Sequence, residues 1–395
     1  MARKPLARQV TSKAPPAELF AAFGGVEKCR ELSTALYARV GNDPALRHLF
    51  PGKTHKCAIE EFSAFLAQFL GGSSEDTQRR WWLSLRESHG RFQIGQTERD
   101  AWIEHMRKAL EDVAISEPMR SALRDLFEEA SVYVVNTGKA VGAVNCPAEH
   151  SDIHAQIGHR WEAQLAVDEA VAAVRKGELH RIITMVGSTP LQTCFERNRP
   201  VFANFVGVLI GSGNISMAEY AFKVLLENPD LAQEKYSGRT LLHAAAAAGN
   251  LLIVEALLER GVDANISDAG GHTPLYSVGN ECSGGAAVVK ALIRGGAKVD
   301  ACGGVKRCTA LHMAARRDYV EVSEALVACG ANIEARDSLG ETPLRRAINC
   351  GQTGVAALLL AKGADPHAVG SKGLTPLSAA REGAMRSLLR SLTGT

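Results

Sequence analysis

Gly340-Glu-Thr342-Pro-Leu-Arg345 is one of five related hexapeptides in the second half of the chain. The others read Gly238-Arg-Thr240-Leu-Leu-His243, Gly271-His-Thr273-Pro-Leu-Tyr276, Arg307-Cys-Thr309-Ala-Leu-His312 and Gly373-Leu-Thr375-Pro-Leu-Ser378. Their threonines are spaced by 33, 36, 33 and 33 residues, and a nearly fixed period of this length is typical of stacked structural repeats. The longer interval contains the glycine-rich segment Cys282-Ser283-Gly284-Gly285, which can loop out between helices without disturbing their stacking.

Each period predicts a pair of helices. In the first copy an alanine-rich helix over 241–248 is followed by a turn at Gly249-Asn250 and a second helix over 251–259. The second helices are expected to end at glycines, which adopt the left-handed conformation at little cost: Gly261, Gly295, Gly330 and Gly363. This pattern resembles the ankyrin repeat, whose Thr-Pro-Leu and Gly-Ala-Asn/Asp signatures are present. The resemblance implies an α-solenoid with short hairpin loops that binds a protein partner.

The repeat pattern also predicts domain boundaries in the second half. Five repeats are expected over 238–395, and 166–237 is expected to hold divergent ankyrin-like helix pairs that form an N-terminal cap, because terminal repeats trade apolar outer faces for polar ones. His243 and His312 occupy repeat positions rather than a ligand cluster. We therefore expect them to make structural polar contacts and not to bind metal.

Composition excludes several classes of protein. The 395 residues carry 45 Lys and Arg against 43 Asp and Glu, which argues against a globally basic nucleic-acid binder. The 46% of hydrophobic residues excludes wholesale disorder. Nine cysteines without a CxxC pair favour reduced thiols and a cytoplasmic protein. Residues 1–17 are interpreted as a disordered arm rather than a signal peptide, and no apolar run reaches the length of a membrane span.

The first half shows no period, but its apolar spacing predicts an all-α domain. Breaks at Asp43-Pro44, Pro51-Gly52 and Gly71-Gly72 separate the helices. Helices are expected over 18–23, 26–40, 56–70, around 82–89, 99–114 and 117–136. Residues 139–165 are interpreted as a linker to the repeats.

Several local motifs occur in order over residues 18–138. They are Phe23-Gly24-Gly25, Tyr37-Ala-Arg-Val40, Asp43-Pro44-Ala-Leu46, Leu49-Phe50-Pro51, Phe65-Leu-Ala-Gln-Phe69-Leu-Gly71-Gly72, His89-Gly-Arg-Phe92 and Arg99-Asp100-Ala101-Trp102. Together they resemble the truncated haemoglobins of the second group, which carry a tryptophan in the G helix. The resemblance implies a helical sandwich that binds haem b, held without covalent attachment because no CxxCH motif is present. O2 or a related diatomic gas is the implied ligand.

The resemblance also assigns roles to individual residues. His89 matches the proximal iron ligand, and Trp82, Leu85 and His89 are spaced for one apolar helix face. Tyr37 and Trp102 match distal hydrogen-bond donors. The remaining residues expected to line the haem are Phe50, Ala58, Phe62, Phe65, Leu66 and Phe92. For each aromatic residue, simple core filling is the alternative.

Two positions depart from the family pattern for binding the haem propionates. Glu61 stands where the family often has an arginine, and Asp76 stands where it has a tyrosine. Arg86 is the candidate substitute as a charge-assisted partner, and a solvated helix arginine is the alternative interpretation.

The favoured function is reversible binding of a diatomic gas at haem, coupled to protein interaction through the repeats, either as a gas sensor or as a localised oxygen-binding protein. One alternative is a haem enzyme that oxidises nitric oxide or consumes peroxide. It would need an external reductant, because the chain contains no recognisable reductase domain. A further alternative is an ankyrin scaffold with a vestigial globin.

The repeats contain a candidate partner site. Arg316, Arg317 and Arg346 follow the repeat signature at positions that could form a local basic patch. An acidic protein segment is the preferred partner, and nucleic acid is disfavoured because no aromatic stacking groups accompany these arginines. The alternative is three solvated arginines without a partner.

Overall fold

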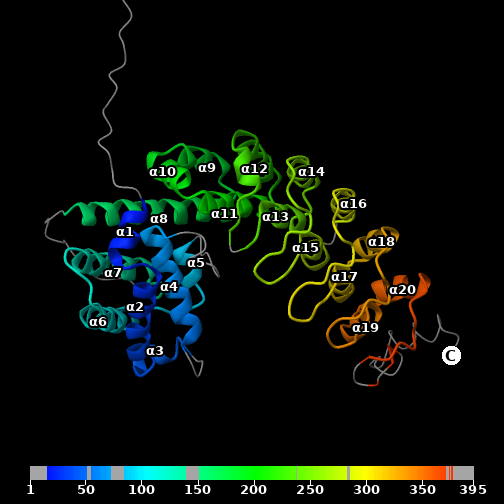
Figure 1. Cartoon of the computed structure of the whole chain (residues 1–395), viewed down its shortest axis with the longest axis horizontal. Helices are drawn as coiled ribbons and strands as arrows, with labels where there is room; N and C mark the ends of the chain where they lie inside the picture. The colour runs from blue at the N-terminus through cyan, green and yellow to red at the C-terminus, as the bar shows by residue number, and fades with distance from the viewer. Residues whose placement is uncertain are drawn as a thin grey trace, which may run out of the picture. The chain divides into compact units, whose positions relative to one another are not determined.

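The computed structural model describes residues 16–50, 55–72, 84–138, 151–236, 238–282, 285–370, 373, 375 and 376. Within these ranges the regular structure is helical, and β-pairing is limited to the isolated bridges Tyr236–Arg239 and Gly303–Cys308. The all-α prediction is therefore confirmed. The chain divides into two compact units, Met1–Asp168 and Glu169–Thr395, which are described separately (Figure 1).

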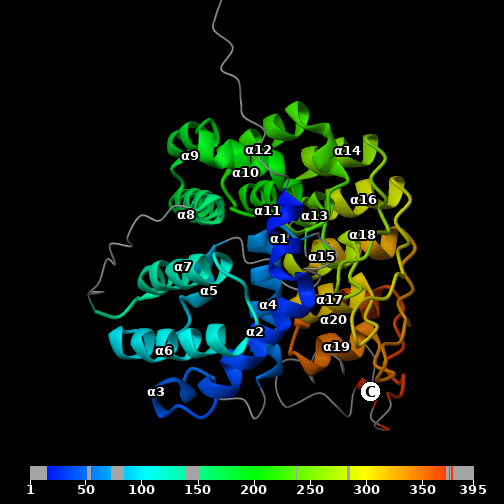
Figure 2. The ribbon, with the colours of Figure 1, turned by 60° about the vertical axis from the view of Figure 1, so that its left-hand side comes forward.

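The first unit contains seven helices and most of an eighth. They are α1 (Pro16–Phe23), α2 (Gly25–Val40), α3 (Pro44–Arg47), α4 (Lys56–Leu70), α5 (Leu85–His89), α6 (Gln96–Asp112), α7 (Met119–Val134) and α8 (Asp152–Lys176). Helix α2 packs mainly against α4 and α6, and α6 lies beside α7 (Figure 2). Fully buried side chains from these helices form the core: Leu32, Leu36, Leu66, Met106 and Leu123.

Local sequence explains where these helices begin and end. Asp43 caps α3 by accepting a hydrogen bond from the Ala45 amide at 2.8 Å, and Ser84 caps α5 by accepting one from the Glu87 amide at 3.1 Å. Gly71 ends α4 in the left-handed conformation, with φ of 95°.

The structure differs from the expected linker over 139–165. Residues 139–150 lie outside the described residues, but Asp152 begins the long helix α8. Ile157 and Trp161 stand four residues apart on one face of α8, and both are buried in the core of the first unit. The Trp161 ring meets Tyr133 of α7 edge to face at 5.7 Å, and the Arg160 guanidinium donates to the Phe69 carbonyl at 2.9 Å. Helix α8 is therefore part of the first unit's packing.

The second unit is a succession of short helices. They are α9 (Leu179–Val186), α10 (Thr189–Arg197), α11 (Arg199–Ile210), α12 (Ile215–Glu227), the 3₁₀ turn η1 (Pro229–Ala232), α13 (Leu241–Ala247), α14 (Leu251–Glu259), α15 (Pro274–Glu281), α16 (Ala286–Arg294), α17 (Ala310–Arg317), α18 (Val320–Ala328), α19 (Pro343–Asn349) and α20 (Thr353–Ala361). Helices α13, α15, α17 and α19 form one row and α14, α16, α18 and α20 form a second (Figure 1).

The repeat signatures act as helix caps. The Thr273, Thr309 and Thr342 hydroxyls accept hydrogen bonds from the amides three residues later, at 3.3–3.4 Å. Helices α9 to α12 precede the first signature, in the segment expected to hold divergent helix pairs. Most of the fifth copy, from residue 377 onward, lies outside the described residues, as do residues 1–15 of the expected arm. No helix in the described ranges is both long enough and apolar enough to cross a membrane.

Candidate functional site

His89 is the last residue of the short helix α5. Its Nδ1 lies 2.8 Å from the Leu85 carbonyl oxygen and 2.9 Å from the Ser88 hydroxyl. Because a carbonyl oxygen can only accept, Nδ1 carries a proton and donates it to Leu85. Burial lowers the pKa of the imidazole below its ordinary value of 6.5. His89 is therefore a neutral ring with its Nε2 lone pair available for a metal ion.

Aromatic rings from three helices and two connecting segments form one continuous cluster beside His89. Phe62 of α4 is central, because its ring lies 6.3 Å from Tyr37 of α2 and 6.2 Å from Trp102 of α6. Phe50 lies 5.5 Å from Tyr37 and 6.2 Å from Phe92, whose ring is 6.5 Å from His89. The structure thus brings together the proximal and distal residues that the sequence predicts.

The same cluster keeps apolar surface partly exposed. Phe50, Ala58, Phe62, Phe65 and Trp102 pack against the core but are only half-buried, whereas Leu66 is completely buried. A contiguous group of half-buried aromatic side chains is typical of a binding site for a large apolar ligand. This set of rings, with the neutral His89 imidazole beside Phe92, fits a haem, which needs an apolar setting and a nitrogen ligand.

Tyr37 is the most deeply buried polar group of this cluster. Burial raises the pKa of its phenol, and the nearby Glu61 carboxylate raises it further. The hydroxyl therefore stays protonated across the physiological range and is available as a hydrogen-bond donor. Glu61, which was considered only for its departure from the expected propionate pattern, thus acts on the Tyr37 phenol.

The residues considered for propionate binding are placed differently. Arg86 is exposed, and its guanidinium carbon lies 4.5 Å from the centre of the Tyr133 ring, a cation–π contact. Asp76 and Trp82 lie outside the described residues. Arg91 was not singled out from the sequence, yet its guanidinium lies 4.7 Å from the Phe92 ring, two residues from His89.

His55 is a second residue that the sequence analysis passed over. Its ring lies nearly parallel to that of Tyr37 at 6.4 Å and meets Phe50 at 6.1 Å. Its Nε2 is buried and has no hydrogen-bond partner among the described residues. His55 precedes the first turn of α4, so the helical spacing of that segment contained no signal for it.

The repeat histidines make structural contacts. His312 accepts a hydrogen bond from the Thr309 amide at Nδ1, at 3.2 Å, and donates from Nε2 to the Glu341 carbonyl of the next repeat at 3.0 Å. His243 makes the equivalent contact with the His272 carbonyl at 3.1 Å. Over the described ranges, no group of three or more acidic, histidine or cysteine side chains is arranged to hold a metal ion.

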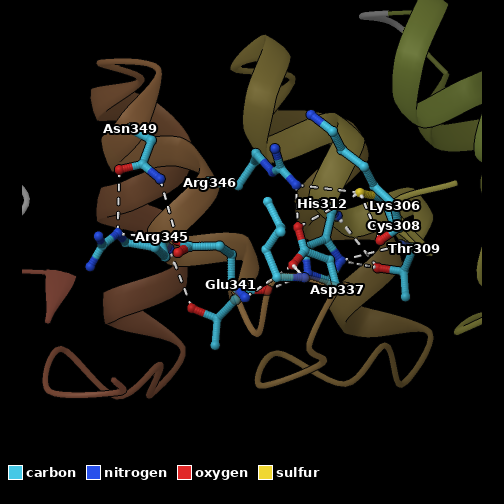
Figure 3. A network of polar contacts seen from close by, with 11 residues as sticks. Lys306, Cys308, Thr309, His312, Asp337, Glu341, Arg345, Arg346 and Asn349 are labelled. Atoms are coloured by element: carbon cyan, nitrogen blue, oxygen red, sulfur yellow. Dashed lines mark hydrogen bonds and ion pairs between the residues drawn. The ribbon is translucent and has the colours of Figure 1, made fainter. Parts of the chain in front are cut away.

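The three arginines of the expected basic patch differ from one another. Arg316 and Arg317 are exposed at the end of α17. Arg346 is mostly buried and forms an ion pair with Asp337, whose side chain is fully buried (Figure 3). The Arg346 guanidinium also lies 3.5 Å from the Cys308 sulfur. Arg346 is therefore committed within the fold, and only the other two present free surface.

Two family models match the chain. Residues 18–136 match the bacterial-like globin family, and residues 209–281 and 280–370 match a model of ankyrin repeats in three copies. The ankyrin match begins at residue 209, within the segment 166–237 that was expected to hold divergent ankyrin-like helix pairs.

Relatives of the two parts are different proteins. The group 2 truncated hemoglobin YjbI of Bacillus subtilis is 30% identical over 116 residues, which cover 29% of this chain and 87% of that protein. Alpha-latrotoxin-Lg1a of Latrodectus geometricus is 35% identical over 135 residues, 33% of this chain but 10% of the toxin. The human ankyrin repeat and SOCS box protein 16 is 35% identical over 155 residues, 36% of this chain and 33% of that protein. The chain therefore spans a tenth to a third of these two repeat-containing relatives, whereas it covers most of the bacterial globin. The chain belongs to the truncated haemoglobin family through residues 18–136, and it carries ankyrin repeats at residues 209–370.

Proposed function

We propose that the first unit binds haem b without covalent attachment, with His89 as the proximal ligand, and that it binds O2 or a related diatomic gas reversibly. The observation that carries this proposal is the fixed, neutral His89 imidazole beside a cluster of half-buried aromatic rings. Haem iron held by one imidazole supplies an open coordination position for a gas. Ligand binding is favoured over enzymatic turnover, because turnover would need an external reductant.

The protein's own residues would tune such a site through hydrogen bonding. The Leu85 carbonyl holds the His89 ring in one tautomer. Tyr37 keeps its proton, and Trp102 carries an indole N–H that can only donate. Both rings contact Phe62, so two donors belong to the same apolar cluster. Arg91 joins Arg86 as a candidate partner of the haem carboxylates, because its guanidinium lies against Phe92, which belongs to the aromatic cluster, whereas that of Arg86 lies against Tyr133.

The absorption spectrum of the purified full chain tests this proposal directly. We expect a Soret band that saturates at one haem per chain and a reversible spectral change when the reduced protein is exposed to O2. A chain that shows no Soret band after reconstitution with haem would overturn the proposal and favour a vestigial globin.

Replacing either distal donor should speed the release of oxygen. Tyr37→Phe and Trp102→Phe each remove a donor but keep most of the ring packing. A hydrogen bond to a group with partial negative charge contributes about 1–3 kcal/mol, so dissociation should be roughly 5- to 150-fold faster. Stopped-flow dissociation rates measure this effect, and haem content should be nearly unchanged.

The double variant Tyr37→Phe/Trp102→Phe tests whether the two donors act on the same bound ligand. If Tyr37 and Trp102 stabilise one bound ligand, their effects will not be additive. Phe65→Leu serves as a matched control, because it alters packing against Phe62 without removing a donor. Dissociation rates that stay at the wild-type value in both single variants would exclude the two residues as stabilising donors.

We propose that the ankyrin repeats bind a protein partner with an acidic segment through Arg316 and Arg317, which are exposed side by side at the end of α17. Arg346 is left out of this surface because it is paired with Asp337. The full chain should capture acidic proteins from cell extract, and an Arg316→Ala/Arg317→Ala variant should no longer capture them. An unchanged set of captured proteins would remove these two residues from the partner site.

A further inference from the structure

The helix that carries His89 is held at its beginning by a residue from far along the chain. The carboxylate of Asp168, in α8, accepts hydrogen bonds from the Leu85 amide at 2.9 Å and from the Arg86 amide at 3.2 Å. These are two of the first amides of α5, which have no partner within their own helix. Asp168 lies beyond residue 136, where the match to the globin family ends.

Helix α5 needs such support because it is only five residues long. A helix of this length is not stable alone, since the cost of its first turn is not offset by later hydrogen bonds. Its other end is held by Asn136, whose side-chain amide donates to the Phe92 carbonyl at 2.7 Å and to the His89 carbonyl at 3.3 Å. The orientation of His89 is therefore set by contacts from outside its own segment.

Asp168 and His89 bind opposite ends of one peptide group. The peptide between Leu85 and Arg86 donates its N–H to Asp168 and accepts the His89 Nδ1 proton on its carbonyl oxygen. A carboxylate on the N–H end increases the electron density on the oxygen, because hydrogen bonds in a chain polarise one another. A stronger acceptor at Leu85 makes the imidazole more electron-rich, as seen for carboxylate partners of metal-bound histidines.

The carboxyl group of Asp168 is buried among hydrogen-bond donors, and its pKa is raised above its ordinary value. Burial causes this rise. Hydrogen bonds from the Leu85 and Arg86 amides, from Tyr133 and from Gln164 oppose that effect. Four hydrogen-bond donors therefore hold the buried Asp168 carboxylate in one position, which an incidental surface contact would not do.

We propose that Asp168 is a positioning residue for the proximal histidine, and that it tunes the electron donation of His89 through the Leu85–Arg86 peptide group. This inference rests on the proposed haem function. It assigns part of the proximal side to α8, outside the segment that defines the family, so the functional globin of this chain would extend to Asp168.

The test compares Asp168→Asn and Asp168→Ala with Glu162→Gln in the full chain. Glu162 is exposed on the same helix, so its replacement removes the same charge without touching α5. In the reduced protein, resonance Raman spectroscopy reports the iron–histidine stretching frequency. We expect this frequency to fall and the haem reduction potential to become more positive in Asp168→Asn, while Glu162→Gln stays at the wild-type values.

Two further measurements distinguish positioning from general destabilisation. Loss of a helix cap should make haem transfer to an acceptor protein about fivefold faster in Asp168→Ala. Hydrogen exchange of the haem-free chain should speed up over residues 84–92 in the same variant. If Asp168→Ala does not fold, the near-isosteric Asp168→Asn decides the question.

The outcomes separate the two proposals. A wild-type chain that binds no haem overturns both. In another outcome, the wild-type chain binds haem through His89, while the iron–histidine stretching frequency and the haem reduction potential are equal in Asp168→Asn and Glu162→Gln. That result overturns only the role of Asp168.

Discussion

His89→Ala is expected to abolish stoichiometric haem binding. The imidazole is the one protein ligand proposed for the iron, and its Nε2 is available because Nδ1 donates to the Leu85 carbonyl. The aromatic cluster around Phe50, Phe62 and Phe92 would remain, so the variant should still take up haem weakly as an apolar molecule. Titrating haem into both proteins and following the Soret band measures the loss.

Adding free imidazole provides a control for this variant. Imidazole fits the space left by the His89 side chain, so it should partly restore the ferrous spectrum if the fold is intact. His48→Ala is the matched histidine variant, because His48 is exposed outside the ring cluster, and it should bind haem normally. Normal affinity and an unchanged spectrum in His89→Ala would require another ligand. His55 would be examined first, because its unpartnered Nε2 lies in the same cluster as Tyr37.

The repeat half of the fold was predictable because each of its rules is local. Thr273, Thr309 and Thr342 each cap the helix that follows, and this needs only residues three positions apart. The 33-residue period then repeats the same contact, as in the bonds from His243 and His312 to the next repeat. Each repeat in such a stack contacts only its neighbours, so the pattern of a single repeat and its neighbour is enough to predict the stacking.

The candidate haem site was predicted from a resemblance to a family, and the structure groups its aromatic residues in one cluster. Tyr37, Phe62 and Trp102 come from three helices, and no spacing within one helix would have brought them together. The sequence motifs predicted this grouping only because they resemble those of a family whose fold is known. Candidate partners for the haem propionates were harder to assign from the sequence, since Glu61 and Asp76 depart from the family pattern.

Contacts that depend on a single distant residue were not predictable. Asp168 is 83 residues from Leu85, and one aspartate on a helix has no local signal of its role. Asp168 follows the expected linker over 139–165 and falls in the segment 166–237 that was assigned to divergent ankyrin-like helix pairs, so nothing connected it with the globin motifs. Arg346 was grouped with Arg316 and Arg317 by charge and by position after the repeat signature, whereas its ion pair with Asp337 depends on how the repeat loop folds back.

Arg346→Ala is expected to destabilise the repeat unit by about 3–5 kcal/mol, because it leaves the fully buried Asp337 carboxylate without its counter-ion. Asp337 is fixed in place, since its Oδ1 also accepts from the Leu339 and Glu341 amides at 2.8 and 3.0 Å (Figure 3). It cannot turn to water without breaking the loop. Denaturant unfolding followed by helical circular dichroism measures the change.

Two comparisons identify the buried charge as the cause. Arg316→Ala/Arg317→Ala removes two exposed arginines and should change the unfolding free energy by no more than about 0.5 kcal/mol per site. Arg346→Ala combined with Asp337→Asn should lose less stability than the sum of the single variants, because the unpaired charge is gone. A single Arg346→Ala variant as stable as the exposed pair would mean that the Asp337 carboxylate reaches solvent, and Arg346 would then rejoin the other two arginines as a candidate for partner binding.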